Sequence, residues 1–546
     1  MAKRLLITLI LAMLLSVMVA AQDATQEAPQ APAETAAPWW DQTVWYELFV
    51  RSFYDSNGDG IGDLQGVIQK LDYLNDGDPN TTSDLGITGI WLMPITKAAS
   101  YHGYDTLDYY AIQPEYGTLD DFKLLLTEAH KRGIRVIVDL VLNHTGSGSE
   151  WFQKSVAGDP KYKDWYVWSD TDPKSIGPWG QNVWYKKGSR YYYAVFWSEM
   201  PDLNYDNPAV RDEAFKIADF WVKDVGVDGF RLDAVKYFVE EEIKGRLVLE
   251  DTPADRAFLA DFRTHVKSLK SDAFIVGEIW DSSAVINRYM NDHSVDVAFE
   301  FDLAKTLVPS AAATTKRDLE RLQKSLQNKY GTQIALFLTN HDQTRLMTAL
   351  KGSVGRNKVA ATLLLTLPGT PFLYYGEEIG MQGDKPDERL RTPMQWDSTI
   401  TGGFTTSRPW ERLQIDFRQV NVADEAADPA SLFNHYRSLI QLRNTHPSLQ
   451  SAGMVAMDKS HPFVYAYVRY AGADKLLVVV NLDDQPVENY SLTLNAGPLA
   501  GITQASVIFG DLPAPALPTI TDAGGFSDYT PWASLPPFST TIVELK

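Results

Sequence analysis

The hydrophobic and polar positions between residues 44 and 378 alternate between two kinds of segment. Apolar runs rich in β-branched and aromatic residues, typical of buried strands, occur as VWYELFV at 44, ITGIWLMP at 87, IRVIVDLVLNH at 134, VDGFRLDAV at 227, AFIVGEIW at 273, VDVAFEFD at 295, QIALFLTNHD at 333 and TPFLYYGEE at 370. Between them, segments such as 120–133 and 209–226 show helical apolar spacing and end at glycine. Strand and helix units repeated in this order predict an α/β fold, a TIM (β/α)8 barrel.

Two parts of the chain depart from this alternation. Residues 145–205, after the third predicted strand, are too many for a simple loop, and we expect them to form an inserted lid domain over the barrel mouth. After about residue 453 the pattern changes to short alternating strands such as KLLVVVNL and TTIVELK, divided by Gly, Pro, Asn and Asp. We therefore expect a barrel over 39–144 and 206–453, and a C-terminal β-sandwich domain over 454–546.

The N-terminus has the pattern of an export signal. Lys3 and Arg4 precede an apolar run to about Val19, and the small residues Ala20 and Ala21 follow. This predicts a signal peptide over 1–21, with an uncleaved membrane anchor as the alternative. Residues 22–38 contain mainly Ala, Pro, Glu, Gln and Thr, a composition that predicts a disordered linker. We expect a secreted, extracellular protein that has no membrane attachment after cleavage, and its lack of cysteine means that it uses no disulfides.

Composition and charge narrow the class of partner. The 546 residues are 45% hydrophobic and 22% charged, which is ordinary for a globular protein. Seventy acidic against 50 basic residues give a formal charge of −20, which repels nucleic acid and anionic membranes. Aromatic residues make up 12% of the chain and supply flat faces for stacking on sugars. A neutral substrate is therefore expected, bound by a monomeric protein.

Polar residues stand where several predicted barrel strands end, which is where catalytic groups of such barrels lie. Arg231 and Asp233 are two apart on one strand, so they share a side, and the guanidinium can hold the carboxylate ionised as a nucleophile. Glu278 ends an apolar strand, where burial would raise its pKa and suit it to act as a general acid. His144, and the pair His341 and Asp342, occupy further strand ends.

A structural explanation exists for each of these residues taken alone: an ion pair for Arg231 and Asp233, a helix cap for Glu278 and satisfied core histidines for His144 and His341. Together they match the requirement of glycoside hydrolysis, which uses two carboxyl groups in different environments.

Four motifs in this order resemble the signature regions of the α-amylase family, glycoside hydrolase family 13: DLVLNH (139–144), GFRLDAVKY (229–237), GEIW (277–280) and FLTNHD (337–342). The resemblance spans about residues 40–546 and implies a retaining hydrolase. It implies that Asp233 is the nucleophile, Glu278 the general acid and base, and Asp342 the third carboxylate. It also implies that Tyr104 stacks on sugar, and that Arg231, His144 and His341 line the subsite on the non-reducing side of the scissile bond.

Within this family, several activities remain open. RTPMQWD resembles oligo-1,6-glucosidases and trehalose synthases, whereas MPDLN resembles the intermediate group of extracellular α-amylases and neopullulanase-like enzymes. Exo-acting members commonly carry an Asp three residues before the stacking tyrosine, and this chain has Tyr101 there. Lys236 matches the lysine that many α-amylases use on the reducing side. We therefore expect an α-amylase that cleaves internal α-1,4 bonds of starch or maltooligosaccharides, with a non-catalytic binding or transport-associated relative as the competing class.

The segment DSNGDGIGDL predicts a structural calcium site after the first strand. Its oxygen donors alternate around glycines, as in the first half of an EF-hand loop, although Gly66 stands where such a loop has glutamate. The alternative is an acidic turn with solvated carboxylates. Many family members hold calcium at the lid through an asparagine, here Asn143, and a histidine, here replaced by Tyr237, so we place the cofactor in the first loop. The expected ligands are Asp55, Asn57, Asp59, the Ile61 carbonyl and Asp63.

Overall fold

The computed structural model describes residues 37–243, 246–313, 321, 334–451, 453–459 and 461–546. Residues 39–546 form one compact unit. The predicted signal peptide and all of the predicted linker except its last two residues lie outside the described residues. Within the described part of the chain, no helix combines the length and apolar composition needed to cross a membrane.

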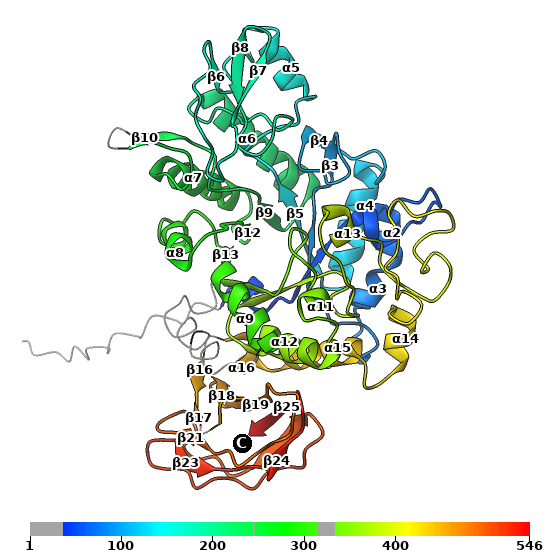
Figure 1. The fold of residues 1–546 in the computed structure, drawn as a ribbon, viewed down its shortest axis with the longest axis vertical. Helices are drawn as coiled ribbons and strands as arrows, with labels where there is room; N and C mark the ends of the chain where they lie inside the picture. The colour runs from blue at the N-terminus through cyan, green and yellow to red at the C-terminus, as the bar shows by residue number, and fades with distance from the viewer. Residues whose placement is uncertain (1–36, 244–245, 314–320, 322–333, 452, 460) are drawn as a thin grey trace, which may run out of the picture. The chain divides into compact units, whose positions relative to one another are not determined.

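A closed barrel of parallel strands forms the centre of this unit (Figure 1), and it confirms the predicted fold class. Going round the barrel, the order is β1-β15-β14-β13-β12-β9-β5-β2. Each strand falls inside one of the predicted apolar runs. Their bounds are β1 Trp45–Leu48, β2 Gly89–Leu92, β5 Arg135–Leu140, β9 Gly229–Leu232, β12 Phe274–Gly277, β13 Val297–Phe299, β14 Ile334–Phe337 and β15 Thr370–Tyr374.

Strand β9 and its neighbours set the positions of the polar groups. Gly229 has a φ of +153°, and a Cβ there would lie 1.8 Å from the Phe274 carbonyl oxygen, so only glycine allows β9 and β12 to approach this closely. In the register with β5, Arg231 lies beside Asp139. Just before β9, Asp228 is fully buried and its carboxylate lies 2.7 Å from Lys270 Nζ. Polar groups therefore flank the strand at both ends.

Helices surround the barrel, and side-chain caps begin many of them. The Asp63 carboxylate accepts from the Gly66 N–H at the start of α2, and Thr118 and Thr252 form capping boxes at the starts of α4 and α7. The helices associated with the barrel are η1 Trp39–Gln42, α1 Val50–Phe53, α2 Leu64–Gln69, α3 Leu71–Leu74, α4 Leu119–Lys131, α6 Pro208–Asp219, η2 Phe220–Val225, α7 Pro253–Leu269, α8 Ser283–Asn291, α9 Phe301–Ala313, α11 Leu346–Ala349, α12 Val354–Thr366, α13 Asp387–Leu390, α14 Val422–Ala427, α15 Leu432–Thr445 and α16 Pro447–Gln450.

Within the described residues, three insertions extend from the barrel. Residues 145–205 contain α5 Glu150–Val156 and a sheet of order β6-β8-β7, with bounds Trp168–Ser169, Trp184–Lys187 and Arg190–Tyr193 for β6, β7 and β8. These elements lie inside the range predicted for the lid. Two antiparallel hairpins were not predicted: β3 Thr96–Ala98 with β4 Thr106–Ile112, and β10 Glu241–Ile243 with β11 Arg246–Val248.

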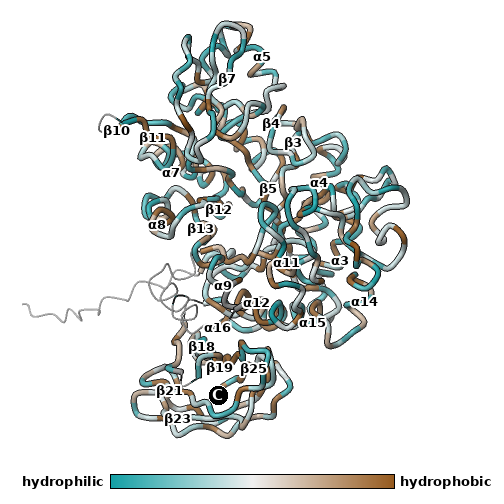
Figure 2. The backbone as a smooth tube through the Cα atoms, viewed as in Figure 1, coloured by the Kyte–Doolittle hydropathy of each residue, from teal (hydrophilic) through white to brown (hydrophobic). Residues whose placement is uncertain are grey.

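The C-terminal strands form antiparallel sheets, as the alternating pattern predicted. A five-stranded sheet of order β16-β18-β19-β25-β22 lies with a three-stranded sheet β17-β21-β23 and a pair β20-β24. The Tyr467 hydroxyl contacts the Thr366 hydroxyl of α12 at 2.5 Å, so this part packs against the barrel. Figure 2 shows hydrophobic stretches at α12 and at the central strands β18 and β19. The bounds are β16 Met454–Ala456, β17 Asp458–Lys459, β18 Val464–Ala471, β19 Asp474–Asn481, β20 Val487–Glu488, β21 Leu492–Leu494, β22 Ala505–Phe509, β23 Phe526–Tyr529, β24 Ser534–Leu535 and β25 Thr540–Leu545.

Candidate active site

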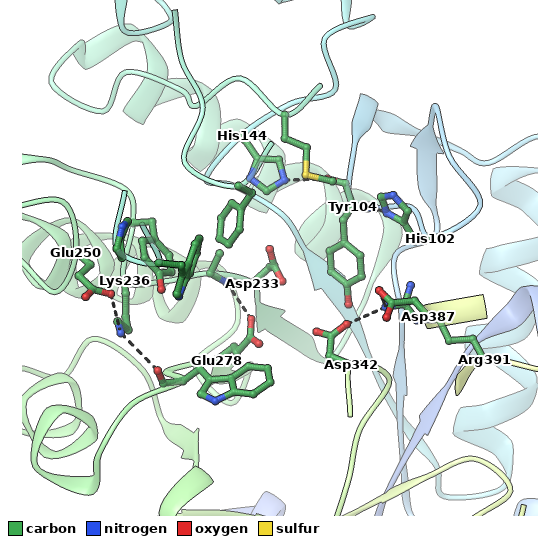
Figure 3. A pocket seen from close by; sticks show the side chains of 17 residues that line it. His102, Tyr104, His144, Asp233, Lys236, Glu250, Glu278, Asp342, Asp387 and Arg391 are labelled. Atoms are coloured by element: carbon green, nitrogen blue, oxygen red, sulfur yellow. Dashed lines mark hydrogen bonds and ion pairs between the residues drawn. The ribbon is translucent and has the colours of Figure 1, made fainter. Parts of the chain in front are cut away.

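A cleft of about 770 Å³ lies at the C-terminal ends of the barrel strands (Figure 3), within the size range of small-molecule sites. The barrel supplies its floor, and the lid supplies part of its wall through Trp179 and Phe196. Six of the eight predicted catalytic and substrate-binding residues line it: Tyr104, His144, Asp233, Lys236, Glu278 and Asp342. The two others, Arg231 and His341, are buried beneath these residues and bind them directly.

Arg231 lies beneath the cleft floor, and its side chain is only 1% exposed. One terminal nitrogen binds Asp233 Oδ1 at 2.5 Å and Asp139 Oδ1 at 2.9 Å. The other binds Glu278 Oε2 at 2.8 Å. One guanidinium therefore binds three carboxylates and keeps the two predicted catalytic groups side by side.

This sharing leaves Asp233 and Glu278 with incompletely compensated charge. Burial raises the pKa of Asp233 to about 6, and Arg231 opposes the shift without cancelling it. Burial likewise raises the pKa of Glu278 to about 7, against Arg231 and with help from the Asp233 charge. The predicted rise in the pKa of Glu278 is therefore present. The expectation that Arg231 can hold Asp233 ionised needs a correction, because burial and the neighbouring Asp139 charge raise the pKa of Asp233 despite Arg231; a pKa near 6 still leaves Asp233 mostly ionised at neutral pH.

Asp342 has a different environment from the other two carboxylates. Its oxygens lie 2.8 Å from an Arg391 terminal nitrogen and 3.3 Å from His341 Nε2. Burial raises the pKa of Asp342, but His341 and Arg391 outweigh burial and hold it below its usual range. Asp342 is therefore a stable anion, which suits it to accept hydrogen bonds from a ligand and not to exchange protons.

Tyr104 joins the histidines to the centre of the site. Its hydroxyl donates to Asp139 Oδ2 at 3.0 Å and lies 2.7 Å from His341 Nε2, and its ring stacks on the His341 ring with centroids 5.4 Å apart. His144 Nε2 lies 3.0 Å from the Tyr104 backbone carbonyl oxygen. Burial lowers the pKa of His144 to about 4, so His144 is neutral at pH 7, and its single N–H, on Nε2, is donated to this carbonyl oxygen.

Lys236 lines the cleft, but its ammonium is already bound. It lies 2.7 Å from Asp281 Oδ2 and 3.0 Å from Glu250 Oε2. The resemblance implied direct contact with substrate on the reducing side, whereas this geometry shows an ion-paired lysine in the cleft wall.

Sequence reasoning missed several polar residues: His102, Glu250 and Asp387 line the cleft, and three others bind the predicted residues. Asp139 begins the quoted motif DLVLNH, and its signal is an acidic residue inside an apolar strand. Glu47 in VWYELFV carries the same signal, and its Oε1 lies 2.5 Å from His341 Nδ1. Arg391 begins RTPMQWD and binds Asp342. Buried charges in apolar runs usually have partners, so Asp139 and Glu47 could have been proposed, but not their partners.

The predicted calcium loop folds around its own carboxylates. Asp55 is buried, and its oxygens accept from the N–H groups of Asn57, Gly58 and Gly60 at 3.1, 2.7 and 2.7 Å. Asp63 accepts from Ser56 and from Gly66. Asp59, Asn57 and the Ile61 carbonyl lie on the same turn, so the donors are all oxygens, as calcium prefers. The residues fit calcium by chemistry, and their hydrogen bonds also organise the loop; calcium here stays a prediction.

A second group of oxygens lies where the barrel meets the lid. The side-chain oxygen Asn143 Oδ1 and one Asp202 oxygen are buried and have no hydrogen-bond partner. Burial and the nearby Glu240 raise the pKa of Asp202 well above its usual value. Orphaned buried oxygens are costly, and a cation would satisfy them. This position, which we discounted from the sequence because of Tyr237, therefore also fits a cation by its donor set.

Comparison with known proteins agrees with this geometry. Residues 47–452 match the family model described as "Alpha amylase, catalytic domain". The chain is 40% identical to Alpha-amylase 3 of Dictyoglomus thermophilum over 82% of its length and 86% of that protein, and 32% identical to an oligo-1,6-glucosidase of Parageobacillus thermoglucosidasius over 82% and 91%. The crystal structure of an α-amylase from H. orenii superposes with a TM-score of 0.78 at 38% identity, covering 92% of this chain and 99% of that one.

Proposed function

The chain belongs to the α-amylase family of glycoside hydrolases, and on this basis we propose that it is an α-amylase that cleaves internal α-1,4 bonds of starch and maltooligosaccharides with retention. The observation that carries this proposal is the guanidinium of Arg231, which binds both Asp233 and Glu278. Sharing one cation keeps the two carboxylates close together. Retaining glycosidases need such a short spacing, about 5 to 5.5 Å, because the second carboxylate attacks the sugar directly.

The two carboxylates have the pKa values that the two roles require. Asp233, with the lower pKa, is ionised near neutral pH and attacks the anomeric carbon while the glycosidic bond breaks. Glu278, with the higher pKa, holds a proton that passes to the leaving oxygen. The covalent glycosyl-enzyme then reacts with water. Glu278, now ionised, takes the proton from that water, and Asp233 is released.

The remaining residues hold the sugar that forms the covalent intermediate. Tyr104 presents its ring to the cleft, and Asp342 accepts hydrogen bonds from sugar hydroxyls as a fixed anion. Neutral His144 lies beside them and fixes the backbone of Tyr104 through its Nε2–H. These contacts orient the ring and favour its distortion toward the transition state.

Position 101 supports internal cleavage over removal of terminal glucose. Tyr101 packs on Trp410 with ring centroids 5.3 Å apart and brings no carboxylate to the cleft. The nearby Arg391 pairs with Asp342 and lies 3.6 Å from Asp387. An acid at position 101 would grip a chain end. The alternatives are oligo-1,6-glucosidase, neopullulanase-like and trehalose synthase activities.

A substrate panel tests the proposal. The protein is incubated with soluble starch, pullulan, isomaltose and maltose, and viscosity and products are followed over time. We expect an early fall in starch viscosity and a series of maltooligosaccharides. Glucose from isomaltose, or trehalose from maltose, without loss of starch viscosity would overturn it in favour of the corresponding alternative.

We propose further that the protein acts outside the cell. The basic, apolar and small-residue segments of 1–21 support this. Edman sequencing of the protein from culture medium should begin near Gln22. Retention of residues 1–21 on a cell-bound protein would instead favour a membrane anchor.

A further inference from the structure

A second pocket lies between the lid and the barrel, apart from the catalytic cleft. Its volume is about 410 Å³, within the size range of small-molecule sites. The lid sheet lines one side of it with Trp168 of β6, Trp184 of β7 and Tyr193 of β8 (Figure 1). The segment around the β10–β11 hairpin lines the other side with Glu240 and Leu249. We call this cavity the lid pocket, and among the described residues none lines both it and the cleft.

A small hydrophobic cluster lies between the lid pocket and the cleft. Tyr193, Ala234 and Tyr237 belong to its buried part, and Trp184 and Phe196 pack against it. Ala234, Tyr237 and Phe196 line the cleft, whereas Tyr193 and Trp184 line the lid pocket. The two cavities therefore adjoin the same packed group from different sides. A ligand in the lid pocket would contact none of the catalytic carboxylates.

Two charged groups of the lid pocket have no partner of opposite charge among the described residues. Arg190 lies over the ring of Trp168, with its guanidinium carbon 4.2 Å from the ring centroid, and donates to the Ser155 carbonyl oxygen at 3.5 Å. Burial raises the pKa of Glu240 to about 7, and the Asp206 charge adds to the shift. A buried acid without a counter-charge is costly unless it accepts hydrogen bonds. The pocket therefore offers a ligand both donors and an acceptor.

The aromatic part of the lining supplies flat apolar faces beside these polar groups. The rings of Trp184 and Tyr193 meet edge to face with centroids 5.4 Å apart. Burial and the Glu240 charge raise the pKa of Tyr193 above its usual range, so its hydroxyl lies near that carboxyl group. Trp184 Nε1–H is buried and has no hydrogen-bond partner within the described chain. A sugar matches such a lining, because it has C–H faces and hydroxyls that both donate and accept.

The charges around the lid pocket favour a neutral ligand over an ion. Its lining includes two basic residues, Lys163 and Arg190, and three acidic residues, Asp164, Asp206 and Glu240. Either sign of ligand charge would therefore meet like charges, whereas hydroxyl groups can bind to both kinds of side chain.

We propose that the lid pocket is a second saccharide-binding site, in which a segment of α-1,4-linked glucan binds with Glu240 accepting from its hydroxyls and Arg190 donating to them. The choice of an α-1,4 glucan rests on the proposed function, and the site itself rests on the lining of the pocket. A second attachment point on the same chain raises the effective concentration of a polymer at the cleft and takes no part in bond cleavage.

Binding is counted in Glu278→Gln, so that the ligand is not consumed. Equilibrium dialysis against radiolabelled maltotriose should give two molecules bound per chain at saturation. A crystal soaked with maltotriose should show one molecule in the cleft and the other in the lid pocket. In this background, adding Glu240→Ala or Arg190→Met should weaken the second site at least about tenfold, the loss expected for one charged hydrogen-bonding group, and leave the first site unchanged.

Lys187→Ala is the matched control for these variants. Lys187 is exposed at the end of β7 and does not line the lid pocket, so this variant should keep both sites. One bound molecule per chain, or a second molecule that binds equally well in both lid-pocket variants, would overturn the proposal. If the wild type does not cleave starch but Glu278→Gln binds two molecules of maltotriose, the proposed function fails and the second site stands.

Steady-state kinetics separate the lid pocket from the cleft. α-Maltosyl fluoride is too short to occupy both sites, whereas starch can reach them together. In Arg190→Met the KM for soluble starch should therefore rise at least about threefold relative to the KM for α-maltosyl fluoride, with kcat for both substrates within about twofold of the wild type. An equal change in both KM values would contradict a separate site for the polymer.

Discussion

Two buried aspartates stand at opposite ends of strand β9, and their surroundings shift their pKa values in opposite directions. Before the strand, Asp228 lies 2.7 Å from both Lys270 Nζ and His130 Nε2 and 3.0 Å from an Arg135 nitrogen. Burial raises the pKa of Asp228, but these partners outweigh burial and hold it well below its usual range. After the strand, Asp233 shares the single cation of Arg231 with other carboxylates, and its pKa rises to about 6.

The difference shows how one residue type serves stability at one end of the barrel and reactivity at the other. Asp228 has three basic partners, so its negative charge stabilises the folded state. Asp233 lies among acids and opens to the cleft, so its charge is only partly stabilised, as the proposed role of nucleophile requires. This matches the division of TIM barrels into a catalytic end and a stability end.

The largest effect should come from Asp233→Asn. The amide keeps the shape of the carboxylate but cannot attack carbon, so kcat on starch should fall by at least about 10⁴-fold, as for other enzymes that lose a nucleophile. Urea unfolding should show little change or a slight gain in stability, because the change removes a poorly compensated buried charge. Near-normal turnover in a verified variant would refute the assignment.

Asp228→Asn should instead lower the stability of the fold and leave turnover almost unchanged. At pH 7 we expect the free energy of unfolding to fall by about 2 kcal/mol, less than for a fully buried pair since the cations are partly exposed, while kcat stays within twofold. Asp219→Asn, which removes a partly exposed partner of His265, is the control and should have little effect.

The stabilities of the two variants, relative to the wild type, should change with pH in opposite directions. The pKa of Asp228 is lowered on folding, so its contribution is present above the unfolded value of about 3.9 and is lost as pH falls through the folded pKa. The deficit of Asp228→Asn should therefore shrink in acid. The pKa of Asp233 is raised on folding, so ionisation of Asp233 destabilises the wild type. The stability of Asp233→Asn relative to the wild type should therefore increase as pH rises from about 4 to 6 and stay at that level above pH 6. The same pH trend in both variants would contradict the comparison.

The pH dependence of activity sharpens the catalytic half of the comparison. The productive form has Asp233 ionised and Glu278 protonated, so kcat/KM on maltopentaose should fall about tenfold per pH unit outside the limits set by the two coupled pKa values, near 6 and 7. The alkaline fall should be absent with α-maltosyl fluoride, whose leaving group needs no proton. Coincident alkaline falls for both substrates would count against Glu278 as the acid.

The smallest effect should come from removal of calcium. The acidic oxygens of the first loop already accept hydrogen bonds from N–H groups, so they need a cation less than unpaired oxygens do. Chelation should lower the unfolding free energy by about 1 to 2 kcal/mol, following the mass-action law for a ligand that binds the folded state. If the ion lies in the first loop, Asp59→Ala abolishes this response. If Asp202→Asn abolishes it and Asp59→Ala does not, the ion lies between barrel and lid, and the first loop is an acidic turn.

Much of this architecture was predictable because it depends on local patterns. Each barrel strand is a short apolar run, and the catalytic candidates follow those runs in the sequence. The partners were not predictable, because they depend on register between distant segments: Asp139 meets Arg231 only through the pairing of β5 with β9. The sharing of Arg231, which decides the pKa of Asp233, and the partners of Lys236 likewise follow from contacts between loops. The two hairpins were not predicted either, because strands of only three to seven residues give a short pattern.

The most direct test of the account is the identity of the residue that bonds to sugar. The protein is treated with a 5-fluoro-α-glycosyl fluoride, which forms the glycosyl-enzyme faster than water removes it, then digested and analysed by mass spectrometry. We predict one added glycosyl group, on Asp233, and none on a Glu278-containing peptide. A label on another residue, or the absence of any label from an enzyme that turns the reagent over, would contradict the assignment of Asp233 as nucleophile.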